Sequence, residues 1–452
     1  MRQFRLLILS VLLPTIQSSA QEALHLSLGD CLDMAVKTST DARNAKLDIQ
    51  IQEAQNKQTI ALAYPHVNAK ADLNYFYLPT MSFADASTFD FTGSLHLPKG
   101  QYVASFQFML PYGADASITT SQVLFDGALT IAVKARNAVL DLAKHKSEMT
   151  EEAVRYNVSK TYYSVAIAQK QFKIVSASLA TMRSMEREQK QYYATGFIEK
   201  LDWERIAVMA NNLATDSIKF ANMMAVADIG LKFLIGVAPT TEIVLTDTAF
   251  EDKRQEALDL VTMTGNYDDL PMIKVLNSAI TLNEYNLKRY KMSALPSLAA
   301  FWAYGNNYGN FTFDKLMHLN RFEANSTVGL QLNMPIFNGF QRKFQIKESK
   351  LNIDKAKNSL EGYKTLVDFQ TQQAKFNISN AVLQFQNQKR NLELSKEVLD
   401  LSSKKYKAGV GSSIEVTQAQ QGLLQSQNNY FSALMDLISA EIELKKVMGL
   451  IK

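Results

Sequence analysis

Short segments of alternating apolar and polar residues mark the predicted strands of this 452-residue chain. Residues take turns in this way from Val67 to Tyr75 and again from Thr327 to Met334. A strand with a period of two has one apolar face and one polar face. Two further segments alternate less regularly, and we assign them from their place in the order of elements. The predicted strands are residues 66–77, 114–125, 297–304 and 325–335.

Apolar residues at steps of three and four mark long helices between the strands. One such seam, typical of a coiled coil, runs from Ile346 through Ile353 and Leu360 to Val367. No proline interrupts residues 112–238 or 336–452, and at ~1.5 Å per residue the longest helices would reach roughly 100 Å. An ordinary helical bundle is the alternative. The predicted helices are residues 28–63, 127–195, 199–235, 257–294, 340–408 and 413–449.

The order of these elements occurs twice. A Phe-Asp-Gly junction at 125–127 recurs as Phe-Asn-Gly at 337–339, and a Tyr-x-x-Gly turn at 193–196 recurs at 406–409. The turns lie 213 residues apart, and a period of this length indicates duplication of a whole unit rather than a solenoid. The predicted domains are a first repeat at 21–236, a linker at 237–256 and a second repeat at 257–452.

The first 20 residues predict a secretory signal peptide. Arg2 and Arg5 precede a short apolar run at 6–13, and small residues precede a cleavage position after Ala20. The run is far shorter than the ~20 apolar residues of a membrane helix. Cys31 lies eleven residues beyond the predicted cleavage position, which excludes an acylated first residue, and we expect it to be a small buried hydrophobic side chain.

Composition excludes several classes of function. The net charge of +4, from 48 basic and 44 acidic residues, is too small a bias to indicate nucleic-acid binding. One cysteine excludes an internal disulfide framework, and the five histidines lack ligand-like spacing. The chain has no P-loop, no Gly-x-Ser-x-Gly and no His-Glu-x-x-His motif. We expect no enzyme activity, no cofactor and no metal site.

The strands also limit how the protein could assemble. Aromatic residues crowd them, as at 75–77 and 301–304, which is typical of membrane barrels, although the face of a soluble β-sandwich is the alternative. Four strands cannot close a barrel, since membrane barrels begin at about eight strands. An open sheet would leave backbone groups unpaired in lipid. If these are membrane strands, several chains share one barrel, and three chains would supply twelve strands.

In this order of elements the sequence resembles the TolC-like outer membrane efflux proteins, the outer membrane factor family. The resemblance covers essentially the whole mature chain and is carried by the duplicated junctions and turns and by the opening stretch from Leu26 to Ala35. It implies a mostly α-helical fold with membrane β-structure, in which a trimeric 12-stranded β-barrel continues into a periplasmic α-helical coiled-coil barrel. It also implies a homotrimer in outer membrane lipid, a periplasmic adaptor protein and an inner-membrane pump of RND or ABC type.

Three groups of residues are the candidate functional sites. Glycine best serves a left-handed residue that ends a helix, and the resemblance implies that the two helix turns dock the adaptor. The turn residues are Tyr193, Gly196, Tyr406 and Gly409. The candidate entrance residues are Asp202, Glu415 and Gln418. The candidate residues of the barrel-to-helix junction are Phe125, Gly127, Phe337 and Gly339.

The entrance residues depart from the family pattern at one position. An acid in the first turn of a helix, such as Asp202 or Glu415, is commonly explained by the helix dipole alone. The resemblance implies acidic rings at Glu415 and Gln418, but Gln418 is neutral, so one ring of charge is missing. At the junctions, we expect glycine to permit a bend and phenylalanine to pack.

The sequence therefore predicts a passive exit duct, serving a tripartite efflux pump or a type I secretion system and opened by adaptor docking at the helix tips. The alternative is a secreted coiled-coil protein with a small soluble β-domain. Residues 78–101 and 305–321 are expected to be extracellular loops.

Overall fold

The computed structural model of the chain describes residues 24–451, except for 79–80, 90–95, 97, 108–109, 248–252, 264 and 317–322. The predicted signal peptide, residues 1–20, lies outside the described residues. The described residues form two compact units, and each takes segments from both predicted repeats. Unit 1 is drawn from Met1–Asp48, Lys144–Val275 and Glu361–Lys452, and unit 2 from Ile49–Ala143 and Leu276–Leu360.

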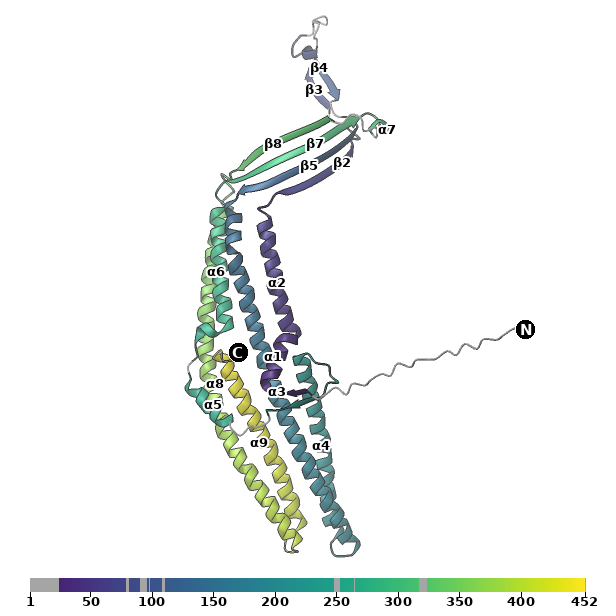
Figure 1. Cartoon of the computed structure of the whole chain (residues 1–452), viewed down its shortest axis with the longest axis vertical. Coiled ribbons are helices and arrows are strands. Elements are labelled where there is room, and N and C mark those ends of the chain that lie inside the picture. Colours follow the sequence, from purple (N-terminus) through teal and green to yellow (C-terminus); the bar gives the residue numbers. More distant parts are fainter. Residues whose placement is uncertain are drawn as a thin grey trace, which may run out of the picture. The chain divides into compact units, whose positions relative to one another are not determined.

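Unit 2 contains one antiparallel sheet built from the four predicted strands (Figure 1). Across the sheet the order is β2 (His66–Tyr75), β5 (Tyr112–Phe125), β7 (Ser297–Asn310) and β8 (Glu323–Asn333). β7 runs six residues past its predicted end because residues 305–310 keep pairing with β5. β2 and β8 are the edges, and within the described residues neither has a partner strand on its outer side.

The register gives this sheet one apolar face and one polar face. Val67 lies opposite Thr120, Thr120 opposite Trp302, and Trp302 opposite Val328, so these residues share a face. Along β8 the apolar face continues with Leu330 and Leu332, and Val328 is 82% exposed. The opposite face is polar at most positions, which include Asn68, Lys70, Asp72, Asp115, Thr119, Asn325, Thr327 and Gln331.

The segment predicted as a loop at 78–101 contains additional structure. Its β3 (Met81–Asp85) pairs with β4 (Val103–Gln107), and the 3-10 turn η1 (Ala86–Phe89) follows β3. The Asp85 carboxylate accepts hydrogen bonds from the N–H groups of Ser87 and Gly100, at 3.0 and 2.7 Å. Its pKa is lowered, mainly by the bonds from Ser87. The second expected loop, 305–321, begins inside β7 and contains α7 (Phe313–Leu316).

Four long helices follow the sequence pattern closely. They are α3 (Gly127–Ala194), α4 (Lys200–Ile235), α8 (Gln341–Lys407) and α9 (Ser413–Val447), and their ends differ from the predicted ones by at most two residues. Along α8 the less exposed positions step by three and four, with Ser349, Ile353 and Val367 buried and Ala356, Leu360 and Tyr363 half-buried between them. The predicted seam is therefore the buried edge of α8.

None of the described helices combines the length and the apolar character that a membrane crossing requires.

Two of the predicted helices are broken. The helix predicted at 28–63 is divided by Ser39 into α1 (Leu28–Thr38) and α2 (Thr40–Ala61). Ser39 is extended, at φ −59° and ψ 144°, and its hydroxyl oxygen accepts a bond from the Ala42 N–H, as a capping serine does. The prediction was wrong here because serine occurs in caps as well as in helices, and no glycine or proline marks the break.

The helix predicted at 257–294 is also divided. It consists of α5 (Lys253–Thr262), the 3-10 turn η2 (Tyr267–Asp269) and α6 (Pro271–Met292). Asn266 caps η2 by accepting a bond from the Asp268 N–H. Pro271 begins α6, where its missing N–H costs no helical hydrogen bond.

The core of unit 1 includes a small parallel sheet that the sequence analysis missed. β1 (Leu24–Leu26) pairs with β6 (Ile243–Leu245), which lies in the predicted linker. The fully buried Tyr162 of α3 joins their ends, because its hydroxyl donates to the Leu26 carbonyl and accepts from the Asp247 N–H, at 3.2 and 3.1 Å. Burial raises the pKa of Tyr162 to about 12.

Cys31 lies in the same core and is fully buried, as expected for a small hydrophobic side chain. Burial raises the pKa of its thiol to about 12, and the charges of Asp30 and Asp247 add to this effect.

Candidate functional site

The two helix reversals, from α3 to α4 and from α8 to α9, have the same backbone geometry. Gly196 has φ +80° and Gly409 has φ +75°. After each glycine the next N–H bonds back to the helix, from Phe197 to the Tyr192 carbonyl at 2.9 Å and from Val410 to the Lys405 carbonyl at 3.1 Å. These are Schellman caps, and the left-handed residue is best filled by glycine. Both reversals are therefore short, well-defined turns.

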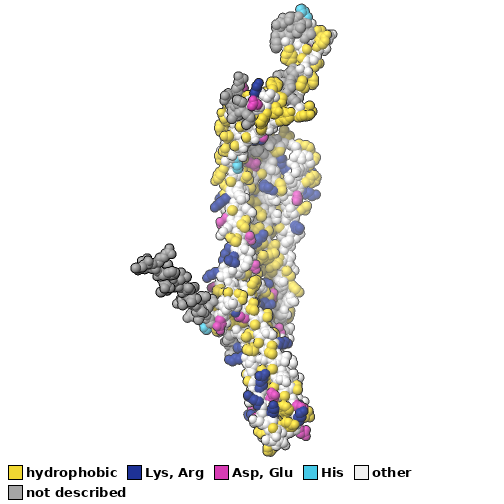
Figure 2. Space-filling model, turned by 90° about the vertical axis from the view of Figure 1, so that its right-hand side faces the viewer, with side chains coloured by type: hydrophobic (Ala, Val, Ile, Leu, Met, Phe, Trp, Pro, Cys, Tyr) yellow, Lys and Arg dark blue, Asp and Glu magenta, His cyan; other side chains and the backbone are white. Residues whose placement is uncertain are grey.

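In each turn, the residue directly after the glycine has a large apolar side chain that is exposed to solvent. Phe197 is 80% exposed and Val410 is 79% exposed. In a Schellman cap the residue at this position usually packs back onto the helix, but here it does not. The sequence analysis missed these residues, although an apolar residue directly after each cap glycine was available as a signal. At this end of unit 1, hydrophobic side chains reach the surface among Lys and Arg side chains (Figure 2).

The two predicted turn tyrosines have different roles. Tyr193 stacks on Trp203 of α4, with ring centroids 5.8 Å apart and planes 10° apart. Tyr406 instead donates a hydrogen bond from its hydroxyl to Oε1 of Gln189 in α3, at 2.7 Å. Desolvation, with the charges of Asp202 and Glu188, raises the pKa of Tyr406. Tyr193 therefore stiffens its own hairpin, whereas Tyr406 joins the α8–α9 hairpin to the α3–α4 hairpin.

Asp202 makes a second link between the hairpins. Its carboxylate accepts a hydrogen bond from the Ser413 hydroxyl at the start of α9, and Arg205 lies 3.8 Å away. Asp202 is therefore part of the contact between the hairpins. Its role at an entrance, like that of Glu415 and Gln418, stays a prediction.

Glu415 and Gln418 lie on one exposed stripe of α9. Along this helix a row of exposed polar residues and one glycine recurs at steps of three and four. The stripe consists of Glu415, Gln418, Gly422, Gln425, Asn429, Ser432 and Asp436. Its two carboxylates stand at its two ends, and the residues between them are neutral. We call this row the α9 stripe.

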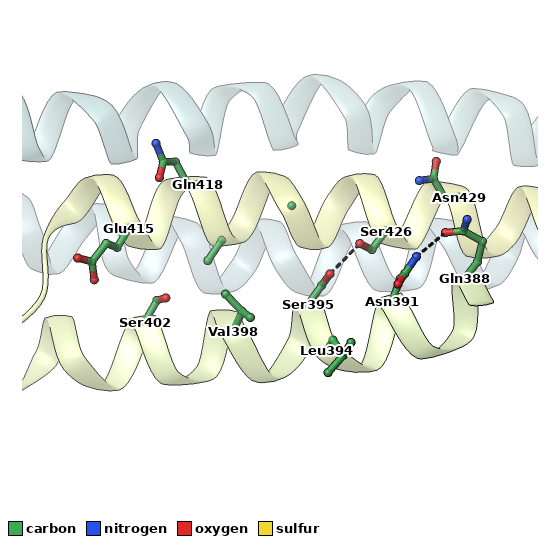
Figure 3. Close-up of a pocket in the computed structure, with 12 residues that line it drawn as sticks. Gln388, Asn391, Leu394, Ser395, Val398, Ser402, Glu415, Gln418, Ser426 and Asn429 are labelled. Atoms are coloured by element: carbon green, nitrogen blue, oxygen red, sulfur yellow. Dashed lines mark hydrogen bonds between the residues drawn. The ribbon is translucent and has the colours of Figure 1, made fainter. Parts of the chain in front are cut away.

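A groove of about 610 Å³ lies between α8 and α9 along the first half of the α9 stripe (Figure 3). Ser395 of α8 and Ser426 of α9 bond across it at 2.7 Å, and Asn391 donates to Gln388 at 3.5 Å. Glu415 is the only charged residue among the twelve that line it. The groove can therefore hold water or a polar chain.

Among the described residues, no group of His, Cys, Asp or Glu could hold a metal ion.

The predicted junction residues divide into two kinds. Gly339 has φ +61° and lets the chain bend into α8, and Phe337 and Phe340 pack edge to face there, 5.3 Å apart. Gly127 does not bend the chain, which corrects the expectation. It begins α3, and a Cβ at this position would lie 2.5 Å from the Met292 carbonyl oxygen, so glycine is needed for the close approach of α6. Phe125 and Phe337 are both exposed.

Comparison with known proteins gives a family for part of the chain and a fold for nearly all of it. Residues 299–450 match the model of the family described as "Outer membrane efflux protein". No curated protein sequence matches the chain.

Three solved structures illustrate the similarity of fold. The outer membrane protein VceC from Vibrio cholerae is 14% identical, with 93% of this chain and 96% of that chain covered and a TM-score of 0.65. The CmeC outer membrane channel of Campylobacter jejuni is 15% identical, with 93% and 85% covered and a TM-score of 0.68. The MtrE outer membrane channel of Neisseria gonorrhoeae, described in an open state, is 16% identical, with 93% and 88% covered and a TM-score of 0.65.

Residues 299–450 thus match the outer membrane efflux protein family, and the chain as a whole shares the fold of outer membrane channels such as VceC and CmeC.

Proposed function

We propose that three copies of this chain form a channel in the outer membrane that serves as the exit duct of an efflux system. The observation that carries the proposal is the sheet of unit 2, whose apolar face is uncovered and whose two edges are unpaired within the described residues. Such a face is stable in lipid, where an unpaired sheet edge is not tolerated. The sheet therefore needs both lipid and further strands.

A second copy is the natural source of those strands. Each strand of the sheet is antiparallel to its neighbour, so β8 of one copy can pair with β2 of the next in the same pattern. Two copies would make eight strands, and barrels of this size are filled by side chains. Three copies make twelve strands, with the polar face toward an open passage.

The long helices support the same assembly. Exposed apolar residues repeat every seven residues along α8, at Phe369, Phe376 and Leu383. Contact with a neighbouring copy would remove this row from water. The α9 stripe, in contrast, is polar along its whole length, which suits the wall of a water-filled passage.

The turns after α3 and α8 are the proposed docking points for a periplasmic adaptor protein. Phe197 and Val410 are exposed apolar residues on fixed turns, and anchors of this kind favour binding. The adaptor would connect the channel to an inner-membrane pump of RND or ABC type, in a tripartite pump or a type I secretion system. The channel itself is a passive conduit, and the pump supplies the energy.

Opening would separate the two hairpins at their contacts. The bonds from Tyr406 to Gln189 and from Ser413 to Asp202 join them near the turns. An adaptor that binds both turns could shift the hairpins only by breaking these bonds. Docking and opening are therefore coupled in this proposal.

The first test is the mass of the detergent-extracted protein, measured by light scattering with correction for bound detergent. We expect a stable trimer. A monomer that is soluble without detergent would contradict the channel, since four strands cannot close a barrel, and would favour a secreted coiled-coil protein.

The second test addresses docking. Phe197→Ser and Val410→Ser should each slow efflux of a dye such as ethidium from cells while leaving the trimer mass unchanged. Leu47→Ser is the control, because Leu47 is an exposed apolar residue of α2, away from both turns. Normal efflux in both turn variants would refute docking at these residues without affecting the trimer.

A further inference from the structure

A pocket of about 560 Å³ lies in unit 1 where the break between α1 and α2 meets the end of α4. It is formed by the very break that the sequence does not predict. The pocket is remote in sequence from the turns, the α9 stripe and the sheet, and the proposed channel makes no use of it. Its volume is within the range of small-molecule sites.

The walls of the pocket are held in place by specific contacts. The Thr38 hydroxyl bonds the carbonyl of Ile235, the last residue of α4. Gly236 then turns the chain at φ +70°, and a Cβ at this position would lie 2.8 Å from the Thr38 hydroxyl oxygen. On the far wall Lys232 donates to the Pro239 carbonyl at 3.2 Å and pairs with Asp228 at 2.6 Å. The pocket is therefore a fixed feature of the fold.

One side of the pocket carries positive charge and hydroxyl groups. Lys37 and Arg43 both line it, and among the described residues neither has a carboxylate within ion-pair distance. Ser39 and Thr40 line the same side. The Ser39 oxygen already accepts a bond from Ala42, and its hydroxyl proton has no acceptor among the described residues, so it can donate to a ligand. The Asp228 carboxylate is occupied by Lys232.

The other side of the pocket is apolar. Ile229, Phe233, Val237 and Pro239 line it, and Phe233 is 81% exposed. A large aromatic side chain so exposed loses favourable burial, which a bound apolar group would restore. Two unpaired cations with hydroxyl donors suit a phosphate, because its several oxygens accept charge-assisted bonds.

We infer that this pocket binds an anionic amphiphile, with its phosphate head at Lys37 and Arg43 and its apolar chain along Phe233. The phosphate head would contact the charged side of the pocket, and the apolar chain would contact the apolar side. A free phosphate ion would use the charged side alone.

The test compares two probes on the trimer held in nanodiscs of a zwitterionic lipid. The probes are hexyl phosphate and inorganic phosphate, and binding is followed by the shift and broadening of the phosphorus NMR signal. We expect hexyl phosphate to bind about tenfold more tightly, because only it can cover Phe233. Equal affinity for the two probes would overturn the amphiphile and leave only a phosphate ion.

Variants separate the two sides of the pocket. Lys37→Gln and Arg43→Gln should each weaken both probes about five- to tenfold. Phe233→Ser should weaken hexyl phosphate to the level of inorganic phosphate and leave the latter unchanged. Lys219→Gln is the matched control, because it removes the same charge from an exposed position of α4 outside the pocket. If Lys219→Gln weakens probe binding as much as Arg43→Gln does, binding depends only on general surface charge, and the site is refuted. Trimer mass is measured for every variant, so a folding defect in one does not hide the result of the others.

Discussion

The α3–α4 and α8–α9 hairpins share their turn geometry and differ in the face they expose. Residues of α4 correspond to residues of α9 at the offset of 213 that relates the two turns. On α4, seven large apolar residues are exposed, among the described residues. Ile229 and Phe233 line the pocket described above, and the other five, between Leu201 and Val226, form the apolar row of α4. On α9 only Ile414 is an exposed large apolar residue, among the described residues. Val208 of α4 corresponds to Gln421, and Met223 to Asp436. The two helices thus present opposite surfaces.

This difference indicates what each hairpin meets in the assembly. An exposed apolar row is costly in water and marks a contact with another surface. A polar row has no such cost and can face a passage. Two hairpins with the same backbone would then serve as the outer contact and the inner wall of one channel.

The interiors of the two hairpins differ as well. On α9, Gln420 is 3% exposed and Gln427 is 5% exposed. Among the described residues, neither Nε2 of Gln420 nor Oε1 of Gln427 has a hydrogen-bond partner. Unpaired buried amide groups weaken packing by about 1–3 kcal/mol each. On α4 the buried Nε1 of Trp203 is also unpaired among the described residues, so the α9 helix has more such groups but not all of them. The larger packing cost on α9 suits the part of the channel that moves.

A charge introduced into the apolar row of α4 should have the largest effect. Val208→Asp should abolish trimer formation, because a carboxylate buried against a neighbouring copy is not solvated. The equivalent change on α9, Gln421→Asp, should have no effect on assembly. Light scattering of both detergent-extracted variants measures this, and a normal trimer in Val208→Asp would show that the α4 row is not an interface.

Replacing a buried amide of α9 by an apolar side chain should improve the packing of that helix. Gln420→Leu should raise the free energy of unfolding by about 1–3 kcal/mol, because it deletes an unpaired polar group, and should lower the open fraction of the channel. Gln421→Leu, at the adjacent exposed position, is the control. Thermal unfolding and single-channel recording test the two effects, and a destabilised Gln420→Leu would mean that the amide finds a partner in the trimer.

Changes at the two turn tyrosines should have smaller effects on channel opening, and the two effects should differ. Tyr406→Phe removes the bond to Gln189, worth about 1 kcal/mol, and should raise the open fraction about fivefold. Tyr193→Phe occupies the equivalent position, keeps its ring stacked on Trp203 and should leave conductance unchanged. If the two variants conduct alike, the hydroxyl of Tyr406 does not restrain opening.

The smallest effect concerns charge at the entrance. Three Glu415 carboxylates near a shared axis would repel one another and oppose closing. Glu415→Gln should therefore lower the open fraction of the channel, and Gln418→Glu should raise it by adding the ring of charge that the chain lacks. Single-channel recording measures this, and an unchanged open fraction in Glu415→Gln would refute the idea.

The sequence predicts well what local periodicity controls. The four strands of the sheet, the four long helices and the two glycine turns follow from periods of two and of three to four residues and from the placement of glycine and proline. These signals are strong because each long element repeats them many times.

Features that depend on distant contacts were not predictable in this way. Beside the break at Ser39, Thr38 bonds to Ile235, nearly 200 residues away in the chain. β1 and β6 are three residues each, too short to show a period. The bond of Asp202 to Ser413 was missed for the same reason, because Ser413 belongs to the other hairpin.

At the two turns, the exposed residues are not the ones that the sequence analysis named. The glycines were correctly placed at the turns, but the residues available to a partner are the neighbours Phe197 and Val410. Their exposure could not be read from the sequence, since an apolar residue after a cap glycine ordinarily packs inward.

The fully buried thiol of Cys31 makes the chain convenient for labelling chemistry. Maleimides and similar reagents attack a thiolate, and a thiol with a pKa of about 12 in a closed core supplies almost none near neutral pH. A cysteine introduced at Phe197 or Val410 could therefore carry a fluorescent or spin probe without replacement of the native one. Pairs of such probes would report the separation of the two turns directly, in the unmodified background of the protein.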